Sequence, residues 1–183
     1  AYLYAGAQGQ YQKYLEWDAF GTYSFLGYEA NDFTIKANAI FKVYPFRKDR
    51  QSPLQLKAHF ETNLKEPDYY EQHLFTNHYK WDNDFGKIST TKVEGTLSIP
   101  RWKLDASFGY ALLDNNIYYD TLGIVRQNTK PMSVMTASLR KDFQLWKFHF
   151  DHRLLFQLSS DKEVMPLPML GLNFRYYAEF VVV

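Results

Sequence analysis

The segment Leu54–Lys65 reads LQLKAHFETNLK, and it decides the class of fold. Its even-numbered positions carry Leu, Leu, Ala, Phe, Thr and Leu, whereas its odd-numbered positions carry Gln, Lys, His, Glu, Asn and Lys. Successive side chains of a β-strand point to opposite faces, so this pattern predicts a strand with one apolar face and one charged face. A strand of this length is long for a soluble protein and typical of one that crosses a bilayer at a tilt.

The same two-residue period recurs along the whole chain. Further regular segments are 15–25, 33–43, 102–112, 148–158 and 170–180, and less regular ones are 2–8, 75–81, 91–99, 117–125 and 135–143. Turn-forming residues separate them, and no segment of helical length has apolar residues at a 3.6-residue period. The sequence therefore predicts an all-β chain of roughly eleven antiparallel strands. It shows no linker, so residues 1–183 are expected to belong to one domain.

The composition excludes a membrane protein built from helices. Each helical span needs about 20 mostly apolar residues in a row, whereas no apolar run here exceeds the five residues of Ala1–Ala5 and the mean hydropathy is −0.43. Aromatic residues reach 19% of the chain, and such residues concentrate in strands and at the bilayer–water interface. The candidate membrane-interface aromatics are Trp17, Trp81, Trp102 and Trp146.

The contrast between the two faces indicates which one meets lipid. The apolar faces are almost free of charge, with Lys141 near a strand end as a tolerable exception. The opposite faces are too charged to form a protein core, because burial of an unpaired ion costs on the order of several kcal/mol. A barrel with a water-filled lumen accommodates both faces and pairs every backbone group across strands. We therefore expect part of an antiparallel up-and-down transmembrane β-barrel in the outer membrane of a Gram-negative bacterium.

The polar face is where function is expected. The candidate pore-lining residues are Glu16, Asp18, Lys36, Lys57, His59, Glu61, Lys92, Glu94, Lys103, Asp105, Asp151, Arg153, Arg175 and Glu179, and Arg140 and Asp142 fall on the same face. Pores select by rings of one sign or by constriction, whereas both signs are interspersed here. The pattern is compatible with a general diffusion lumen and with transverse ion pairs that stiffen the wall. The loop lengths do not decide which end of the barrel faces the cell exterior.

Several stretches resemble one known family. They are 13–19 (KYLEWDA), 76–85 (TNHYKWDNDF), 100–104 (PRWKL) with 109–115 (GYALLDN), 139–143 with 145–148, and 157–160 to 166–168 followed by 173–177. These stretches resemble the putative porin family of the Bacteroidota outer membrane, and they cover nearly the whole chain in order. The resemblance implies a large outer-membrane barrel of which this chain is an internal portion toward the C-terminal half. It implies a fold and a location more firmly than a substrate.

The sequence contains no convincing catalytic or metal-binding motif. His149 and His152 lie an odd number of residues apart, which on a strand places them on opposite faces, and His73 and His78 have the same defect. His59 and Glu61 share a polar face and could form an acid–base pair, but two pore-lining charges are the simpler interpretation. We therefore expect no enzyme activity, no metal and no cofactor. The net charge of +1 argues against nucleic acid as a partner.

Two functional hypotheses follow from these patterns. The first is a passive channel in which small hydrophilic solutes or ions diffuse through a polar lumen. The alternative is a structural or accessory barrel subunit docked against other outer-membrane proteins, since a protein partner can replace lipid on an apolar face. In both cases the expected surroundings are outer-membrane lipid. The strand-like start at Ala1 and the end at Val183 without a turn are expected for a segment of a longer chain.

Overall fold

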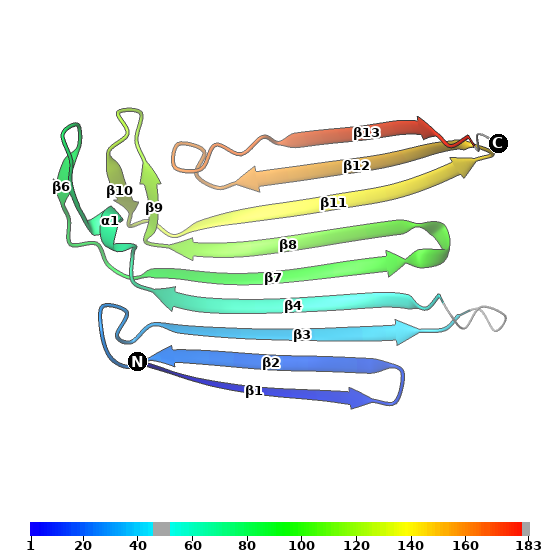
Figure 1. Ribbon diagram of the computed structural model, residues 1–183, viewed down its shortest axis with the longest axis horizontal. Helices are drawn as coiled ribbons and strands as arrows, with labels where there is room; N and C mark the ends of the chain where they lie inside the picture. The colour runs from blue at the N-terminus through cyan, green and yellow to red at the C-terminus, as the bar shows by residue number, and fades with distance from the viewer. Residues whose placement is uncertain (46–51, 181–183) are drawn as a thin grey trace.

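The computed structural model describes residues 1–45 and 52–180. In these residues nine long strands form one sheet in the order β1-β2-β3-β4-β7-β8-β11-β12-β13. Their bounds are β1 (Tyr2–Tyr11), β2 (Leu15–Ser24), β3 (Phe33–Val43), β4 (Leu54–Lys65), β7 (Ile88–Ile99), β8 (Leu104–Asp114), β11 (Met132–Leu145), β12 (Phe148–Ser159) and β13 (Leu170–Ala178). Every neighbouring pair is antiparallel, which confirms the predicted all-β, up-and-down fold (Figure 1).

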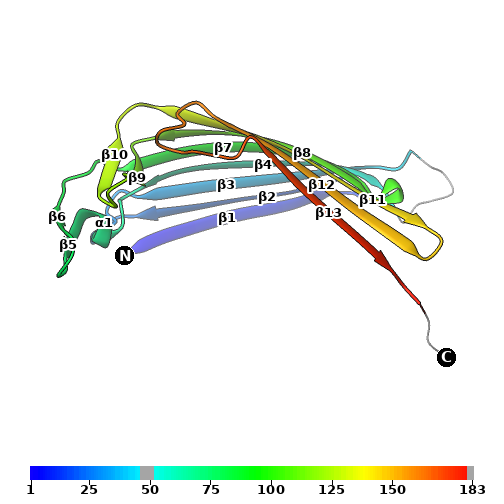
Figure 2. The same ribbon diagram turned by 90° about the horizontal axis from the view of Figure 1, so that it is seen from above.

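The sheet is twisted and curved, and within the described residues it is not closed (Figure 2). Strands β1 and β13 are its two edges, far apart in the sequence and in space. No helix in residues 1–45 and 52–180 is long and apolar enough to span a membrane. The only helical turns in that part of the chain are α1 (Tyr69–Gln72) and the 3-10 turn η1 (Pro100–Trp102).

Two short hairpins project from one end of the sheet and correct the sequence prediction. One consists of β5 (His73–Phe75) and β6 (Lys80–Asp82), and the other of β9 (Asn116–Tyr119) and β10 (Val125–Asn128). The predicted strands 75–81 and 117–125 each span the tip of one of these hairpins, so the expectation that they cross the sheet was wrong. The described sheet has nine strands rather than eleven.

The strand register carries the alternation across the whole sheet. Trp17 lies opposite Ala39, and the row continues through directly opposed residues to Ala58, Gly95, Phe108, Ala137, Phe156 and Leu170. The next row toward the long connections contains Asp18, Asn38, His59 and Glu94 in the same way. Because opposed residues point to the same side of a sheet, one face is apolar and the other polar from β1 to β13. We call these the apolar face and the polar face.

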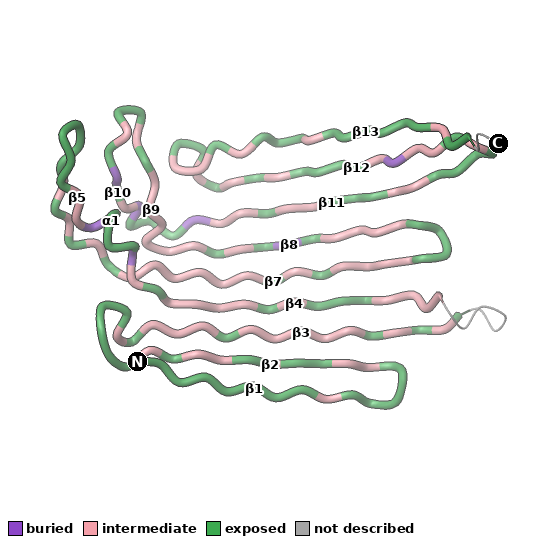
Figure 3. The backbone as a smooth tube through the Cα atoms, viewed as in Figure 1, coloured by how far each residue is buried: buried purple, intermediate pink, exposed green. Residues whose placement is uncertain are grey.

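Neither face is covered by another layer of the described chain. The buried hydrophobic residues of that part are Val125, the first residue of β10, and Met132, the first residue of β11, and Figure 3 shows that the nine strands are exposed or half-buried except at isolated positions. Large apolar side chains such as Phe108 and Leu172 are about half exposed, at 52% and 56%. The sheet therefore has no interior of its own, and its apolar face needs a surrounding other than water.

The two ends of the sheet differ in their connections. At one end the strands are joined by the long connections 25–32, 66–87, 115–131 and 160–169, of 8 to 22 residues, and at the other by 12–14, 100–103 and 146–147, of two to four residues, and by the longer connection 44–53. We call these the long-loop end and the short-turn end. Trp17, Trp102 and Trp146 all lie at the short-turn end, exposed by 42%, 54% and 74%. Trp81 instead lies in β6, on a projecting hairpin, and its indole N–H donates to the carbonyl of Tyr70 at 3.0 Å.

Candidate functional site: the polar face of the sheet

The polar face gathers most of the candidate pore-lining residues. By the register of the strands it holds Glu16, Asp18, Lys36, Lys57, His59, Glu61, Lys92, Glu94, Asp105, Asp151, Arg153 and Arg175. Two candidates lie outside the strands. Lys103 occupies the left-handed position that ends η1, with φ 46°. Glu179 follows β13, and its backbone N–H donates to the carbonyl of Lys147 at 3.0 Å.

Between β2 and β7 the charges are arranged as cross-strand pairs. Lys36 lies directly opposite Glu61, with 3.1 Å between Nζ and Oε1. Lys42 of β3 and Glu16 of β2 approach to 2.5 Å, whereas the 2.8 Å pair of Lys92 and Glu94 lies along β7 itself. Opposite charges on neighbouring strands stabilise a sheet by roughly 0.2–1 kcal/mol per pair. The pairs Lys36–Glu61 and Lys42–Glu16 lie across the strands, as expected for transverse pairs that stiffen a wall.

A hydrogen-bonded chain of side chains crosses the same region. The imidazole Nδ1 of His59 donates to Asn38 Oδ1 at 2.6 Å, and Asn38 Nδ2 donates to Asp18 Oδ2 at 2.7 Å. His59 Nε2 lies 3.6 Å from Glu61, which already accepts the ammonium of Lys36. Both members of the acid–base pair considered from the sequence are therefore engaged in the wall of the sheet. They lie on the polar face in a chain of polar contacts.

Between β8 and β13 the charges form a compact arginine–aspartate cluster around Asp151, which is only 6% exposed. Its carboxylate accepts a hydrogen bond from Arg175 and another from Arg153 at 3.2 Å, and Arg140 Nε lies 3.7 Å away. Arg140 also pairs with Asp142 at 3.3 Å. Directly opposed like charges, such as Arg140 and Arg153, repel each other, so the interleaved aspartates are what allows three guanidinium groups to share this surface.

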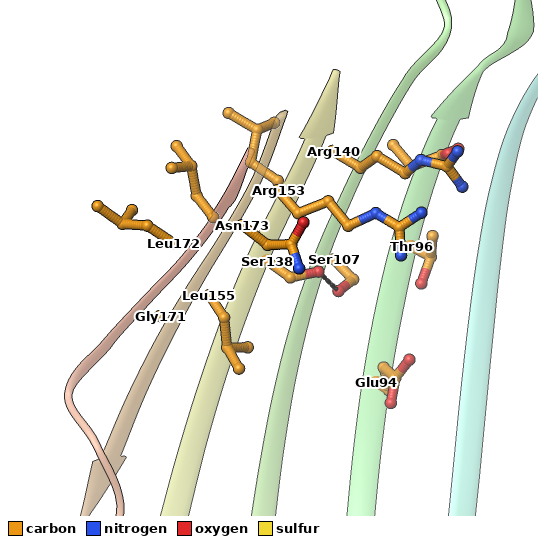
Figure 4. Close-up of a pocket in the computed structure, with 13 residues that line it drawn as sticks. Glu94, Thr96, Ser107, Ser138, Arg140, Arg153, Leu155, Gly171, Leu172 and Asn173 are labelled. Carbon is orange, nitrogen blue, oxygen red and sulfur yellow. Dashed lines mark hydrogen bonds between the residues drawn. The ribbon is translucent and has the colours of Figure 1, made fainter. Parts of the chain in front are cut away.

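A hollow of about 540 Å³ lies on the polar face beside this cluster. Its polar lining comes from Glu94, Thr96, Asp105, Ser107, Ser138, Arg140, Arg153 and Asn173. Figure 4 shows the guanidinium groups of Arg140 and Arg153 extending across the sheet toward Thr96. The hydroxyls of Ser107 and Ser138 hydrogen-bond each other at 2.7 Å. The hollow presents hydrogen-bond donors and acceptors together with side chains of both charges. Such a lining suits transient hydrogen bonding to hydrated solutes.

Alternation in the sequence had placed Arg140 and Asp142 on this face, but they were not among the candidates. Ser107 and Ser138 were not among the candidates either. Ser107 lies directly opposite Ser138, and that register across β8 and β11 is the signal that unites them. A pattern read along one segment contains no such information, since the two serines are far apart in the chain.

The long connections are held by a second set of polar contacts. Lys87 pairs with Asp32 from the 25–32 connection and with Glu66 from its own connection, at 3.4 Å in the second case. Burial lowers the pKa of the Lys87 ammonium, but the hydrogen bonds and charges of Asp32 and Glu66 outweigh it and raise the pKa above its usual value. The backbone N–H of Glu66 donates to both carboxylate oxygens of Asp32, at 3.0 and 2.9 Å. Two connections are thus joined at one point.

Gln127 of β10 joins the two longest connections. Its amide nitrogen donates to the carbonyl of Gly86 at 2.7 Å, and its amide oxygen accepts the backbone N–H of Gly86 at 2.9 Å. The amide of Asn115 donates to the carbonyl of Lys87 at 3.1 Å beside it. The 66–87 and 115–131 connections therefore form one ordered rim rather than independent loops.

The described residues contain no group of three or more His, Asp or Glu side chains placed to hold a metal ion. The face is a surface of paired charges, amides and hydroxyls. Such a surface can hydrate and guide polar solutes, and its mixed charges give it no dominant sign.

Comparison with known protein families shows which family the chain belongs to. A family model described as "Putative porin" matches residues 1–183, the whole chain, and confirms the resemblance that the sequence motifs indicated. No curated protein and no solved structure matches this chain.

Proposed function

This chain belongs to the putative porin family, and from that premise we propose that it forms part of the wall of an outer-membrane channel for small hydrophilic solutes. The observation that carries the proposal is the chemical contrast between the two faces, which the register maintains across all nine strands. Water on one side and lipid on the other satisfies both faces. A soluble protein would leave an apolar patch far larger than the few hundred Å² that monomers usually expose.

The backbone supports the same surroundings. In a bilayer every N–H and C=O must be paired within protein, so an open sheet edge is not stable there. The edge strands β1 and β13 therefore require further strands, which would close the sheet into a barrel around the polar face. Twist and curvature of the kind seen in Figure 2 are what closure requires.

The lengths of the connections support an orientation. Outer-membrane barrels have short periplasmic turns and longer extracellular loops. We assign the long-loop end, with its ordered rim at Lys87 and Gln127, to the cell exterior. The short-turn end, with Trp17, Trp102 and Trp146, then lies at the periplasmic interface, where Trp side chains are enriched.

The expected selectivity is weak. Charges on the polar face are interspersed and largely neutralised in pairs such as Lys36 with Glu61, and they do not form a ring of one sign. Small ions and neutral solutes are expected to pass by diffusion, with size as the main filter. No covalent step is involved.

Planar bilayer recording with the full-length protein tests the proposal. We expect stepwise current increments on insertion, and swelling of liposomes in small sugars at rates that fall with sugar size. A correctly folded barrel that inserts but carries no current would overturn the channel. A stable complex with another outer-membrane protein after mild detergent extraction, together with the absence of current, would support the accessory-subunit alternative instead.

A further inference from the structure

Two basic side chains interrupt the apolar face. Apart from Asp114 at the end of β8, Lys141 of β11 and His152 of β12 are the only acidic or basic residues that the register places on this face within the described sheet. They lie directly opposite each other on neighbouring strands. A lysine on the lipid-facing side of a barrel is unfavourable, and most so at the bilayer midplane. Two such groups side by side therefore indicate a polar ligand on this surface.

The immediate surroundings offer donors but no counter-ion. The ammonium of Lys141 donates to the carbonyl of Trp102 and lies 5.2 Å from the ring centroid of Phe143. His152 Nε2 lies 3.3 Å from the hydroxyl of Tyr176. Among the described residues neither basic side chain has a carboxylate within 4.0 Å. Lys36, Lys42 and Lys92 on the polar face all have one.

Aromatic rings enclose the pair. The His152 ring lies 5.0 Å from Phe174 and 5.6 Å from Phe143 and Tyr176, centroid to centroid. Tyr176 is 63% exposed, so its hydroxyl is open to a ligand. Rings of this kind flank a headgroup region, where one side of a ring is in hydrocarbon and the other meets polar groups.

The position of the pair along the strands places it near the edge of the bilayer. Lys141 pairs with Leu104, the first residue of β8, which follows η1 and Trp102 directly. The site is therefore level with a turn of the short-turn end. A lysine at this height can extend its ammonium into the headgroup layer while its stem stays in hydrocarbon.

From these contacts we propose that Lys141, His152 and Tyr176 bind the phosphate of an anionic glycerophospholipid on the outer surface of the sheet. The ammonium of Lys141 supplies the missing charge pair, and His152 and Tyr176 supply hydrogen-bond donors to phosphate oxygens. The acyl chains lie against the apolar face beside Phe174. This inference rests on the membrane location that the proposed function assumes, but not on conduction through the lumen.

Native mass spectrometry of the full-length protein, with phosphatidylglycerol or phosphatidylcholine added to the detergent, measures the preference. The wild-type protein is expected to retain phosphatidylglycerol more strongly than phosphatidylcholine. Lys141→Gln should reduce that preference about fivefold, since one basic residue near an anionic surface contributes about that factor. Lys141→Arg should retain most of it. His152→Phe should lower the preference less than Lys141→Gln does, because it removes a hydrogen-bond donor rather than a full charge.

Lys57→Gln is the matched control. It removes the same charge from the same sheet, and Lys57 is exposed on the polar face without an ion pair among the described residues. The inference is overturned by an unchanged preference in Lys141→Gln, or by an equal loss in Lys57→Gln. If Lys141→Gln does not insert, Lys141→Met replaces it in the same assay, since its side chain is compatible with lipid. Current recordings separate the two proposals, because Lys141→Gln should conduct as the wild type does.

Discussion

Asp151 on β12 lies directly opposite Arg175 on β13 and accepts a hydrogen bond from its guanidinium. The same carboxylate accepts Arg153 and faces Arg140, which also pairs with Asp142, so one nearly buried acid contacts three cations on the polar face. Charge-assisted hydrogen bonds of this kind are stronger than neutral ones and fix side-chain positions. Asp151 therefore determines both the order and the net charge of this part of the wall.

Asp151→Asn should shift the ion preference of the proposed channel toward anions. The substitution leaves Arg140, Arg153 and Arg175 with less compensation next to the hollow, so the local potential becomes more positive. The reversal potential in a KCl gradient measures this change. Asp18→Asn is the control, because Asp18 bonds the amide of Asn38 rather than a cation, and its shift should be smaller. Equal reversal potentials in Asp151→Asn and the wild type would show that the cluster does not face the permeating ions.

Gly9 and Trp17 form a close contact on the apolar face. They lie directly opposite each other on β1 and β2, and a Cβ on Gly9 would approach the indole Nε1 to 2.6 Å. Gly9→Ala should force the indole away and lower the free energy of unfolding by about 1–3 kcal/mol, as overpacking usually does. Guanidinium unfolding followed by tryptophan fluorescence measures the loss. Gly95→Ala should change little, since a Cβ there meets nothing within 4 Å.

Lys87→Met should loosen the rim at the long-loop end. It removes the cation that joins Asp32 to Glu66 and leaves two carboxylates facing each other. Limited proteolysis of the intact protein at neutral pH should then cut within 66–87 faster than in the wild type, while the strands stay protected. Because the pKa of Lys87 is raised, its contribution is complete below the ordinary value of 10.5 and is lost as the pH rises through the folded value. Unchanged cleavage would mean that other contacts hold the rim.

The β9–β10 hairpin should open in acid. Asp120 accepts Arg126 Nε at 2.7 Å and the backbone N–H groups of Leu122 and Ile124 at 2.9 and 3.0 Å. The hydrogen bond from Arg126, with those from the backbone, lowers the pKa of Asp120 below its usual 3.8. Its contribution is therefore present above pH 3.8 and lost as the pH falls through the lowered value.

Hydrogen exchange of the hairpin segment, corrected for the intrinsic rate at each pH, checks this prediction. Protection at Leu122 and Ile124 should disappear in acid, and Asp120→Ala should show the same loss at neutral pH. Protection that persists in Asp120→Ala would show that the turn does not depend on this carboxylate.

The sequence was sufficient for the strands and their faces. The pattern in Leu54–Lys65 corresponds to β4 residue for residue, and the same period located the other long strands. The two-residue period misassigned the segments 75–81 and 117–125. The short hairpins there have the same alternation as the long strands, and only their place outside the nine-stranded sheet distinguishes them. Each segment that is wrongly taken as a strand crossing the membrane reverses the direction assigned to the chain after it. The sequence prediction therefore placed long and short connections at both ends of the sheet, which is why it left the orientation open.

The polar face was predicted as a set of residues but not as an arrangement. Alternation assigns a side chain to a face, whereas pairs such as Lys36 with Glu61 depend on the register between strands. The cluster at Asp151 of β12 depends in addition on the register of β12 with both of its neighbouring strands, β11 and β13. Register is set by turns and packing throughout the sheet, and a single segment does not contain it.

The central claim is that the polar face lines a water-filled lumen while the apolar face meets lipid, and cysteine accessibility during current recording tests it most directly. Lys57 and Ala58 are adjacent and exposed on β4, and they point to opposite faces. The chain contains no cysteine, so a cysteine introduced at either position is its single thiol. A charged, membrane-impermeant thiol reagent should lower the current of Lys57→Cys and leave that of Ala58→Cys unchanged. A lipid-soluble reagent should label Ala58→Cys. Equal reaction of both positions with the charged reagent, or reaction at Ala58→Cys alone, would contradict the account.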